Sequence, residues 1–429
     1  MPNGTYGGVR GKETKVGQKT FVSRPTRLQP KTIAMEYQSG KKYLVYLYLL
    51  LGALAAFPPL VTDMYLPALP VMTAEFHTSP SAVQMSLAAC IIGLAVGQLF
   101  FGPLSDKWGR KPLLKSAIAL FILATVASIF SPTIDILNIC RFFQGLGGAG
   151  GVVLSRSVAT DCYSGRELAK TLAIIGAING IAPVTAPVIG GLFSESIGWK
   201  GIFCILLAIG LILYAVSIPF RESHPVSKRY AGTMTSLFTQ AGSLLKNGSY
   251  MRYVLIFGMS NAVLFGYISS ASFILQNDFG LSELMFGVLF GINSMAIGSG
   301  SIISLKLRQI ANASHIGCAG MLACSMLQLC CYYLGVGFWG YEILVFVMLF
   351  SVGMVFTSST TLAMTEGKAM IGWASAIVGA TGFFFGGIVT PLVGIGTIQL
   401  SSYCVMAICS IVALQMSYMA YKSSRSAIA

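Results

Sequence analysis

The chain has 429 residues, of which 55% are hydrophobic and 10% charged, with a mean hydropathy of +0.75. Soluble domains carry about 25% charged residues, so this composition excludes a soluble globular protein and indicates an integral membrane protein. The net charge of +14 would also suit a nucleic-acid-binding protein, but the basic residues gather at the N-terminus and in alternate loops. That distribution favours a membrane explanation and no nucleic-acid partner.

The first 42 residues are polar and basic, without the apolar segment of a cleaved secretory signal. We expect residues 1–42 to form a disordered cytoplasmic tail that rests on anionic lipid headgroups. Met35 is an alternative start, which would remove residues 1–34 from the protein.

About twelve apolar runs follow, each long enough to cross ~30 Å of hydrocarbon as a helix of ~20 residues. A β-barrel is excluded because its strands would alternate polar and apolar residues. We therefore expect an all-α integral membrane protein with about twelve transmembrane helices. The runs are 43–70, 81–104, 112–130, 136–155, 169–193, 201–220, 251–275, 283–305, 316–338, 341–364, 371–396 and 398–420.

The longest interruption between the runs divides the expected helices into six and six. AIIGA at 173–177 recurs as AIVGA at 376–380, and such echoes favour duplication of a six-helix unit, as in two-bundle transporters. The expected parts are an N-terminal bundle (43–220), a cytoplasmic linker (221–250), a C-terminal bundle (251–421) and a cytoplasmic tail (422–429).

Basic residues mark one side of the expected membrane protein. They cluster in every second loop, whereas the loops between hold only Lys200. Because cytoplasmic loops carry the excess of lysine and arginine, both termini are expected in the cytoplasm.

Asp63 is the only carboxylate well inside an apolar run, and Arg141 is its basic counterpart. A charged side chain at membrane depth costs several kcal/mol, so such residues are rare unless they have a role. The two residues indicate a protein that moves protons, ions or charged solutes.

The expected depths of these two residues bring them together. Asp63 lies nine residues before the expected end of the first span, or ~13 Å, and Arg141 lies ~8 Å from the same surface. Arg141 would favour an ionised Asp63, whereas desolvation would favour the protonated acid. We expect a pair whose carboxyl changes protonation as a cavity opens to either side; a static buried ion pair is the alternative.

The loop after the second run carries GPLSDKWGRKP at 102–112. Its two glycines permit tight turns and close helix approach, and its aspartate can pair with nearby bases or with the N-terminus of a neighbouring helix. Such a latch would hold the cytoplasmic side closed; the alternative is a loop that only sets topology. The predicted cytoplasmic gate is Gly102, Asp106, Gly109, Arg110 and Lys111.

At these residues the chain resembles the major facilitator superfamily, whose loop 2–3 signature this is. RFFQG at 141–145 is similar to the family's fourth-helix motif, in which the arginine is associated with proton transfer in proton-coupled members. TDMYLPALP at 62–70 narrows the resemblance to the Bcr/CflA-type drug-resistance subgroup. The resemblance covers about 44–421 and implies the major facilitator fold of two six-helix bundles in the bacterial inner membrane.

Two stretches bear on the exporter type. The segment 176–191 resembles the fifth-helix motif of the exporters, although Ala186 replaces a glycine there. Some related exporters carry a second acid in the first helix where this chain has Ala55, which argues against transport with several protons. The motif residues are Gly176, Gly180, Pro183, Pro187, Gly190 and Gly191.

Polar and aromatic residues that stand out among aliphatic neighbours are candidates for a substrate cavity, because aromatics and methionine suit varied amphipathic molecules. We read the ten cysteines, which include no CxxC, as buried free thiols, and expect no metal and no cofactor. The candidate cavity residues are Met64, Tyr65, Gln144, Asn179, Asn261, Tyr267 and Phe273.

The sequence therefore predicts a monomeric, proton-coupled transporter that exports small hydrophobic or cationic compounds by alternating access. A Walker motif is absent from the sequence, so ATP hydrolysis is not the motor. A dedicated exporter of a metabolite or siderophore and an uptake symporter are the alternatives. An enzyme or receptor would need a clustered catalytic set or a large soluble domain, and the sequence suggests neither.

Overall fold

The computed structural model describes residues 41–230, 232, 234–307 and 309–426, and all regular structure within them is helical. The expected all-α fold is confirmed. Of the expected N-terminal tail, residues 1–40 lie outside the described part of the chain.

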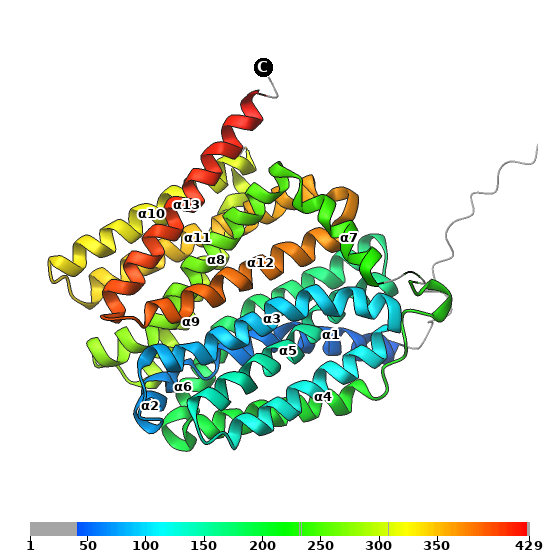
Figure 1. Ribbon diagram of the computed structural model, residues 1–429, viewed down its shortest axis with the longest axis horizontal. Helices are drawn as coiled ribbons and strands as arrows, with labels where there is room; N and C mark the ends of the chain where they lie inside the picture. The colour runs from blue at the N-terminus through cyan, green and yellow to red at the C-terminus, as the bar shows by residue number, and fades with distance from the viewer. Residues whose placement is uncertain (1–40, 231, 233, 308, 427–429) are drawn as a thin grey trace, which may run out of the picture. The chain divides into compact units, whose positions relative to one another are not determined.

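The elements follow in chain order in Figure 1. The first half holds α1 (Lys41–Asp63), the short turn η2 (Leu66–Ala68), α2 (Leu69–Glu75), α3 (Pro80–Trp108), α4 (Arg110–Ile129), α5 (Ile134–Cys162) and α6 (Gly165–Ser217). The linker holds η3 (Val226–Lys228) and α7 (Met234–Leu245). The second half holds α8 (Gly248–Phe273), η4 (Ile274–Asp278), α9 (Glu283–Lys306), α10 (Ile310–Tyr333), α11 (Phe338–Glu366), η5 (Lys368–Met370), α12 (Ile371–Val393) and α13 (Ile398–Ser426).

The helices account for the apolar runs of the sequence. Ten segments of the described chain are long and apolar enough to cross a membrane. The fourth run forms α5, a helix of 29 residues that holds four charged side chains. The fifth and sixth runs share α6, a 53-residue segment in which two helices meet at Gly198 without a loop. Gly198 has φ 64°, a backbone conformation that glycine adopts without a steric penalty.

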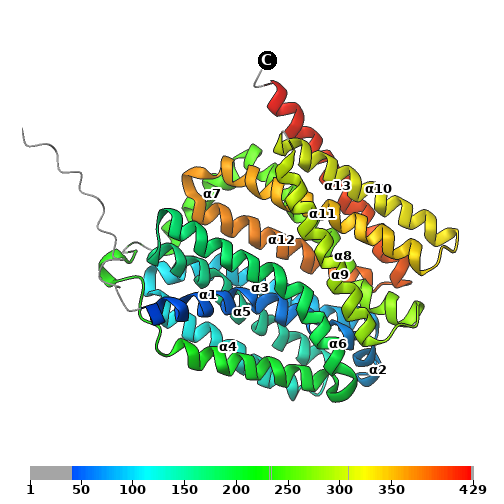
Figure 2. The ribbon, with the colours of Figure 1, turned by 180° about the vertical axis from the view of Figure 1, so that it is seen from behind.

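Most helix contacts stay within one half of the chain. In the first half α5 packs against α3, α4 and α1, and α6 packs against α1 and α4. In the second half α8 packs against α11, α12 and α13, while α11 packs against α9 and α10. The halves meet mainly through α3 with α12 and α6 with α9, and α2 also contacts α8. Figures 1 and 2 show α3 and α12 running side by side.

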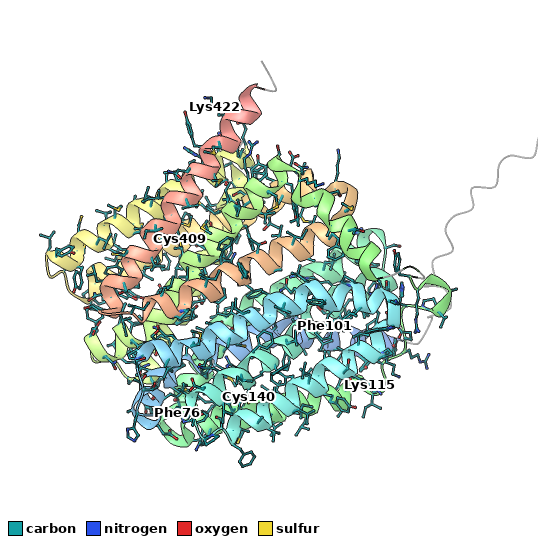
Figure 3. The ribbon with its side chains drawn as sticks, in the orientation of Figure 1. Phe76, Phe101, Lys115, Cys140, Cys409 and Lys422 are labelled. Carbon is teal, nitrogen blue, oxygen red and sulfur yellow. The ribbon has the colours of Figure 1, made fainter. Side chains whose placement is uncertain are left out.

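Two labelled residues identify the ends of the helices. Lys115 near the start of α4 and Phe76 after α2 lie at opposite ends of the first half in Figure 3. We call these the basic end, which also carries Lys107 and Lys111, and the far end. The basic end is the one that the positive-inside rule predicts for the cytoplasm.

The two halves are hydrogen-bonded to each other at the far end. Each of these bonds runs from a side chain of one half to a backbone carbonyl of the other. The bonds are Ser81 to Pro391 (3.0 Å), Gln84 to Ser269 (2.9 Å), Ser272 to Leu66 (2.7 Å) and Gln276 to Pro67 (2.9 Å).

Glycines let α6 and α9 meet backbone to backbone at the same end. A Cβ on Gly287 would lie 2.5 Å from the carbonyl oxygen of Pro187, and a Cβ on Gly191 would overlap the carbonyl oxygen of Glu283. Only a residue without a side chain permits this approach. The far end of the interface between the halves is therefore closely packed.

We predict that Gly287→Ala destabilises the protein, because the added methyl group would push α9 away from Pro187. Overpacking of this kind costs about 1–3 kcal/mol. Gly298→Ala on the same helix is the matched control, since a Cβ there meets nothing within 4 Å. Thermal unfolding of the purified protein in detergent should show a lower midpoint for Gly287→Ala alone. Equal midpoints for both variants would contradict the close contact.

Candidate functional site

Arg141 on α5 is completely buried between the helices of the first half. One of its terminal nitrogens donates to the backbone carbonyl of Val61 on α1 at 3.0 Å. The other donates to Gln144, one turn further along α5. The guanidinium carbon lies 4.3 Å from the centre of the Tyr65 ring, within range of a cation–π interaction. The charge is therefore held by a carbonyl, an amide and an aromatic face.

A chain of hydrogen bonds fixes the orientation of this guanidinium. Gln144 accepts from Arg141 through its carbonyl oxygen and donates through its amide nitrogen to Thr125 on α4 at 2.8 Å. Thr125 in turn donates to the carbonyl of Phe121 at 2.7 Å. Every member has the donor or acceptor that its neighbour needs, so Gln144 serves to position Arg141.

Asp63 is the last residue of α1 and is 5% exposed. Its carboxylate oxygen lies 2.7 Å from the hydroxyl oxygen of Thr62, which also lies 3.0 Å from the carbonyl oxygen of Pro58. Both neighbours of this hydroxyl are oxygens. A hydroxyl has a single proton to donate, so Thr62 cannot donate to both of them at once.

The expected pair of Asp63 and Arg141 is not formed in this structure. Among the ion pairs within 4.0 Å in the described residues, none includes either side chain. The estimated depths of Asp63 and Arg141 agree with the structure to within two residues, because Arg141 contacts Val61. However, α1 ends at Asp63 instead of continuing to residue 70, so the guanidinium meets the backbone and not the carboxyl group.

The expected cavity residues are packed inside the structure. Tyr65 lies within hydrogen-bond distance of Ser86, and Asn261 donates to the carbonyl of Phe257. Tyr267 lies within 3.1 Å of the amide nitrogen of Asn293. The side chain of Asn179 lies outside the described part of the chain. The buried residues of the set are Met64, Tyr65, Gln144, Asn261, Tyr267 and Phe273.

A cavity of about 390 Å³ lies instead at the basic end, between α3 and α5 on one side and the start of α12 on the other. Two residues of the expected gate, Gly102 and Asp106, line it, whereas none of the expected cavity residues does. Arg156 and Trp373 are also part of its wall. The two halves are thus separated by a cavity at the end where the gate motif lies.

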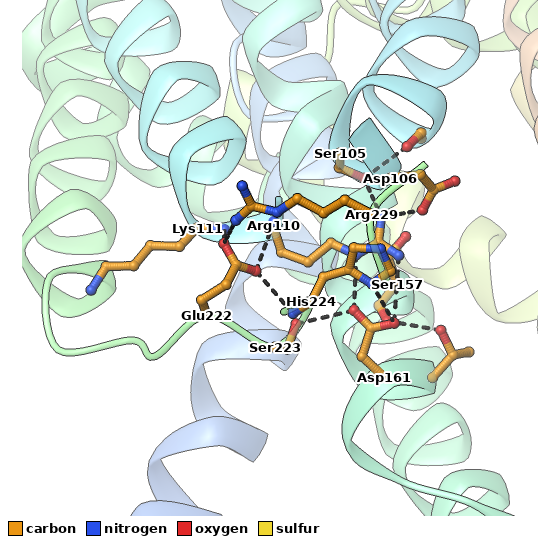
Figure 4. Close-up of polar contacts among 12 residues, drawn as sticks. Ser105, Asp106, Arg110, Lys111, Ser157, Asp161, Glu222, Ser223, His224 and Arg229 are labelled. Atoms are coloured by element: carbon orange, nitrogen blue, oxygen red, sulfur yellow. Dashed lines mark hydrogen bonds and ion pairs between the residues drawn. The ribbon is translucent and has the colours of Figure 1, made fainter. Parts of the chain in front are cut away.

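Arg110 is the centre of an ion network at the basic end, drawn in Figure 4. It forms ion pairs with Asp106 at 2.6 Å and with Asp161 at the end of α5 at 2.9 Å. Ser223 donates to Asp161 at 3.1 Å, and His224 lies 3.8 Å from the same carboxylate. These partners belong to the first half and to the linker. In the described part of the chain, these contacts tie the linker to the first half.

Glu222 of the linker caps the N-terminus of α4. Its two oxygens accept from the backbone nitrogens of Arg110 at 2.9 Å and Lys111 at 3.1 Å. A carboxylate is stabilised there by unpaired N–H groups and by the helix dipole. Gly109 has φ 97°, and a Cβ on it would lie 2.6 Å from Glu222 and 2.5 Å from Arg229. The backbone conformation favours glycine at this position, and a Cβ would also displace the ends of these two side chains.

No sequence signal predicts the pairing of these charged residues. Glu222 and Arg229 stand in a charged linker, and Asp161 stands near the end of a run, so each resembled an ordinary solvent-exposed charge. Asp161 and Glu222 bind Arg110 from 51 and 112 residues away in the chain, and only the fold brings them together.

The exporter-type motif of α6 divides into two parts. A Cβ on Gly176 or Gly180 would meet nothing within 4 Å, so no close helix contact is formed at these two glycines. Pro183 and Pro187 lie inside the helix. Gly190 lies against the carbonyl of Met64 just after α1, as Gly191 does against α9. The second part of the motif therefore holds α1 and α9 close to α6.

Comparisons with known proteins agree with this arrangement. The sequence matches the Major Facilitator Superfamily over residues 50–391. It is 37% identical over 370 residues to the uncharacterized MFS-type transporter YdgK of Bacillus subtilis, which covers 83% of this chain and 90% of that protein. It is 27% identical to a bicyclomycin resistance protein homolog of Haemophilus influenzae over 80% of this chain and 88% of the relative.

The fold also matches a solved structure. A bacterial homolog of the human lysosomal transporter Spinster, in an inward-facing and occupied conformation, superposes with a TM-score of 0.71. The match covers 89% of this chain and 98% of that one, at 14% sequence identity. This chain therefore belongs to the Major Facilitator Superfamily, as a multi-pass membrane transporter and not an enzyme.

Proposed function

We propose that this protein exports small hydrophobic or cationic compounds across the cytoplasmic membrane in exchange for protons, with Asp63 as the proton carrier. The observation that carries the proposal is the geometry of Thr62 between Asp63 and Pro58. If Asp63 is protonated, it donates to Thr62, and Thr62 donates to the carbonyl of Pro58. Both protons then have an acceptor. An ionised Asp63 would compete with Pro58 for the single proton of Thr62.

Burial supports the same protonation state. Asp63 is 5% exposed and has no cation within ion-pair distance among the described residues. An unpaired carboxylate in such surroundings is unfavourable, and a buried acid commonly takes up a proton instead. The structure thus suits the state in which the carrier is loaded with a proton.

Arg141 supplies a partner for the other state. Its bond to the carbonyl of Val61 is a weaker interaction than an ion pair with a carboxylate. When Asp63 loses its proton, the guanidinium can leave Val61 for the carboxylate, and this exchange moves the end of α1 against α5. Loss of the proton is thereby linked to a change in helix packing.

The two ends of the molecule support alternating access. The far end is closed by hydrogen bonds and glycine contacts between the halves, and the basic end holds the cavity. With the basic end in the cytoplasm, this is an inward-facing state of two six-helix bundles. Asp106 lies on one wall of the cavity and the first residues of α12 on the other. On closure, the N-terminus of α12 offers a favourable partner for this acid.

The proposed substrate class rests on the relatives. The bicyclomycin resistance protein homolog, at 27% identity, favours drug efflux. The apolar part of the cavity wall, which includes Trp373 and aliphatic side chains, suits hydrophobic molecules. A dedicated exporter of one metabolite or siderophore would use the same machinery. Proton movement in the same direction as the substrate, instead of the opposite direction, would identify an uptake symporter.

We predict that Asp63→Asn abolishes the coupling, because an amide cannot carry the exchanged proton. The purified variant in proteoliposomes should show no proton movement when a lipophilic cation is added across an imposed pH gradient. Asp135→Asn, an exposed acid at the start of α5, is the matched control and should behave like the unmodified protein. Active transport at the normal rate by Asp63→Asn would refute the assignment of the carrier.

We also predict that Asp106→Asn slows transport without weakening substrate binding. The residue is in the ion network and at the cavity wall of the basic end, whereas Asp63 is at the end of α1. Transport rate in proteoliposomes and equilibrium binding of the same lipophilic cation should therefore separate, with binding within a few-fold of normal. Loss of binding in a well-folded variant would show that Asp106 contacts substrate directly.

A further inference from the structure

A second buried carboxyl group lies in the half of the chain that does not contain Asp63. Glu342 near the start of α11 is 9% exposed. The side-chain amide of Asn293 on α9 donates to it at 2.7 Å and lies 3.1 Å from the hydroxyl of Tyr267 on α8. Three helices of the second half therefore meet at one polar group. We propose that Glu342 is a second proton-binding site, positioned by Asn293 and Tyr267.

No positive charge balances this acid. Across the described residues, no ion pair within 4.0 Å includes Glu342. The ionisable groups that act on the cluster are Tyr267, Tyr341 next to Glu342, Tyr403 of α13 and Asp278 of η4. All of these groups are neutral when protonated and negative when ionised, so none supplies a positive charge to a carboxylate. A proton on Glu342 removes the charge that they cannot neutralise.

Not every polar group of the cluster has a hydrogen-bond partner. Three buried oxygens have no partner: the second oxygen of Glu342, the carbonyl oxygen of Asn293 and the hydroxyl of Tyr341. Leaving a charged oxygen buried and unpaired is more unfavourable than leaving a neutral one. The protonated acid is therefore the form that these surroundings tolerate best.

The same geometry favours a proton over a metal cation. Both protons of the Asn293 amide are directed at Glu342 and Tyr267, so the positive end of this dipole faces the carboxylate. A hard cation prefers several oxygen ligands around it, and an amide nitrogen already occupies one side of this acid. The site suits a group that is neutral when occupied.

The cluster lies beside the contact that must break during transport. Ser294 follows Asn293 in α9 and lies 3.4 Å from the carbonyl oxygen of Pro183 on α6. Separation of α6 from α9 at the far end would therefore disturb Asn293 and expose Glu342 to the side of the membrane opposite the cavity. This use of the site in transport rests on the proposed function, whereas proton binding itself does not.

Infrared spectroscopy of the full-length protein in lipid nanodiscs tests the proposal without transport. The carbonyl stretch of protonated carboxylic acids would be followed as the pH is changed from acid to alkaline. Glu342→Gln should lack one titrating component, and Asp63→Asn should lack a different one. Glu195 is an exposed glutamate in the middle of α6, at the far end of the molecule, and Glu195→Gln should keep both of these components. Glu342→Asp, a second variant, should restore a titrating component at a shifted frequency.

The outcomes separate the two proposals. If Glu342→Gln lacks one titrating component but the unmodified protein shows no antiport, the second proton-binding site stands and the proposed function is rejected. A spectrum of well-folded Glu342→Gln that titrates like the unmodified protein would overturn the second site. If sodium chloride, but not choline chloride, removes the Glu342 component at constant pH, the site binds a metal cation and the proposal is wrong.

Discussion

The buried guanidinium of Arg141 is the constraint on which the first half of the molecule depends. Arginine stays charged in proteins, so burying it obliges the surroundings to supply acceptors. The carbonyl of Val61, the amide of Gln144 and the ring of Tyr65 do so. They bring the end of α1 against α5, and Gln144 adds α4. These contacts hold the Arg141 charge without an ion pair to Asp63.

The two ends of the interface between the halves use different interactions. At the far end, backbone carbonyls meet glycines and side-chain donors across the interface. At the basic end, the charged residues around Arg110 pair within the first half and its linker. In the state that the structure describes, these ion pairs therefore stabilise the first half and its linker.

The spans and the gate motif could be predicted from sequence because their signals are local. Apolar length gives the number of helices, and Gly109 and its acid and base neighbours are close in the chain. The partners of Arg110 could not be predicted, since Asp161 and Glu222 are far away in sequence. Depth arithmetic gives position along the membrane normal but not around a helix, so the expected pair of Asp63 and Arg141 missed the bond to Val61.

The burial of Glu342 could not be predicted from the sequence either. It stands near the start of an apolar run, where an acid normally faces water, and only the packing of α8 and α9 buries it. The polarity of Tyr267 among aliphatic neighbours indicates a functional position. In the structure, however, Tyr267 is part of the polar cluster around Glu342 and does not line the described cavity.

The cap on α4 has a consequence for how the polypeptide could be divided. Glu222 and the backbone nitrogen of Tyr230, which donates to the carbonyl of Asp106 at 3.0 Å, bind the first half, and Arg229 pairs with Glu222. These contacts all precede α7 in the chain. A chain interrupted between Tyr230 and α7 would keep every one of these contacts, so the transporter could be produced as two separate polypeptides that assemble in the membrane through α3, α6, α9 and α12.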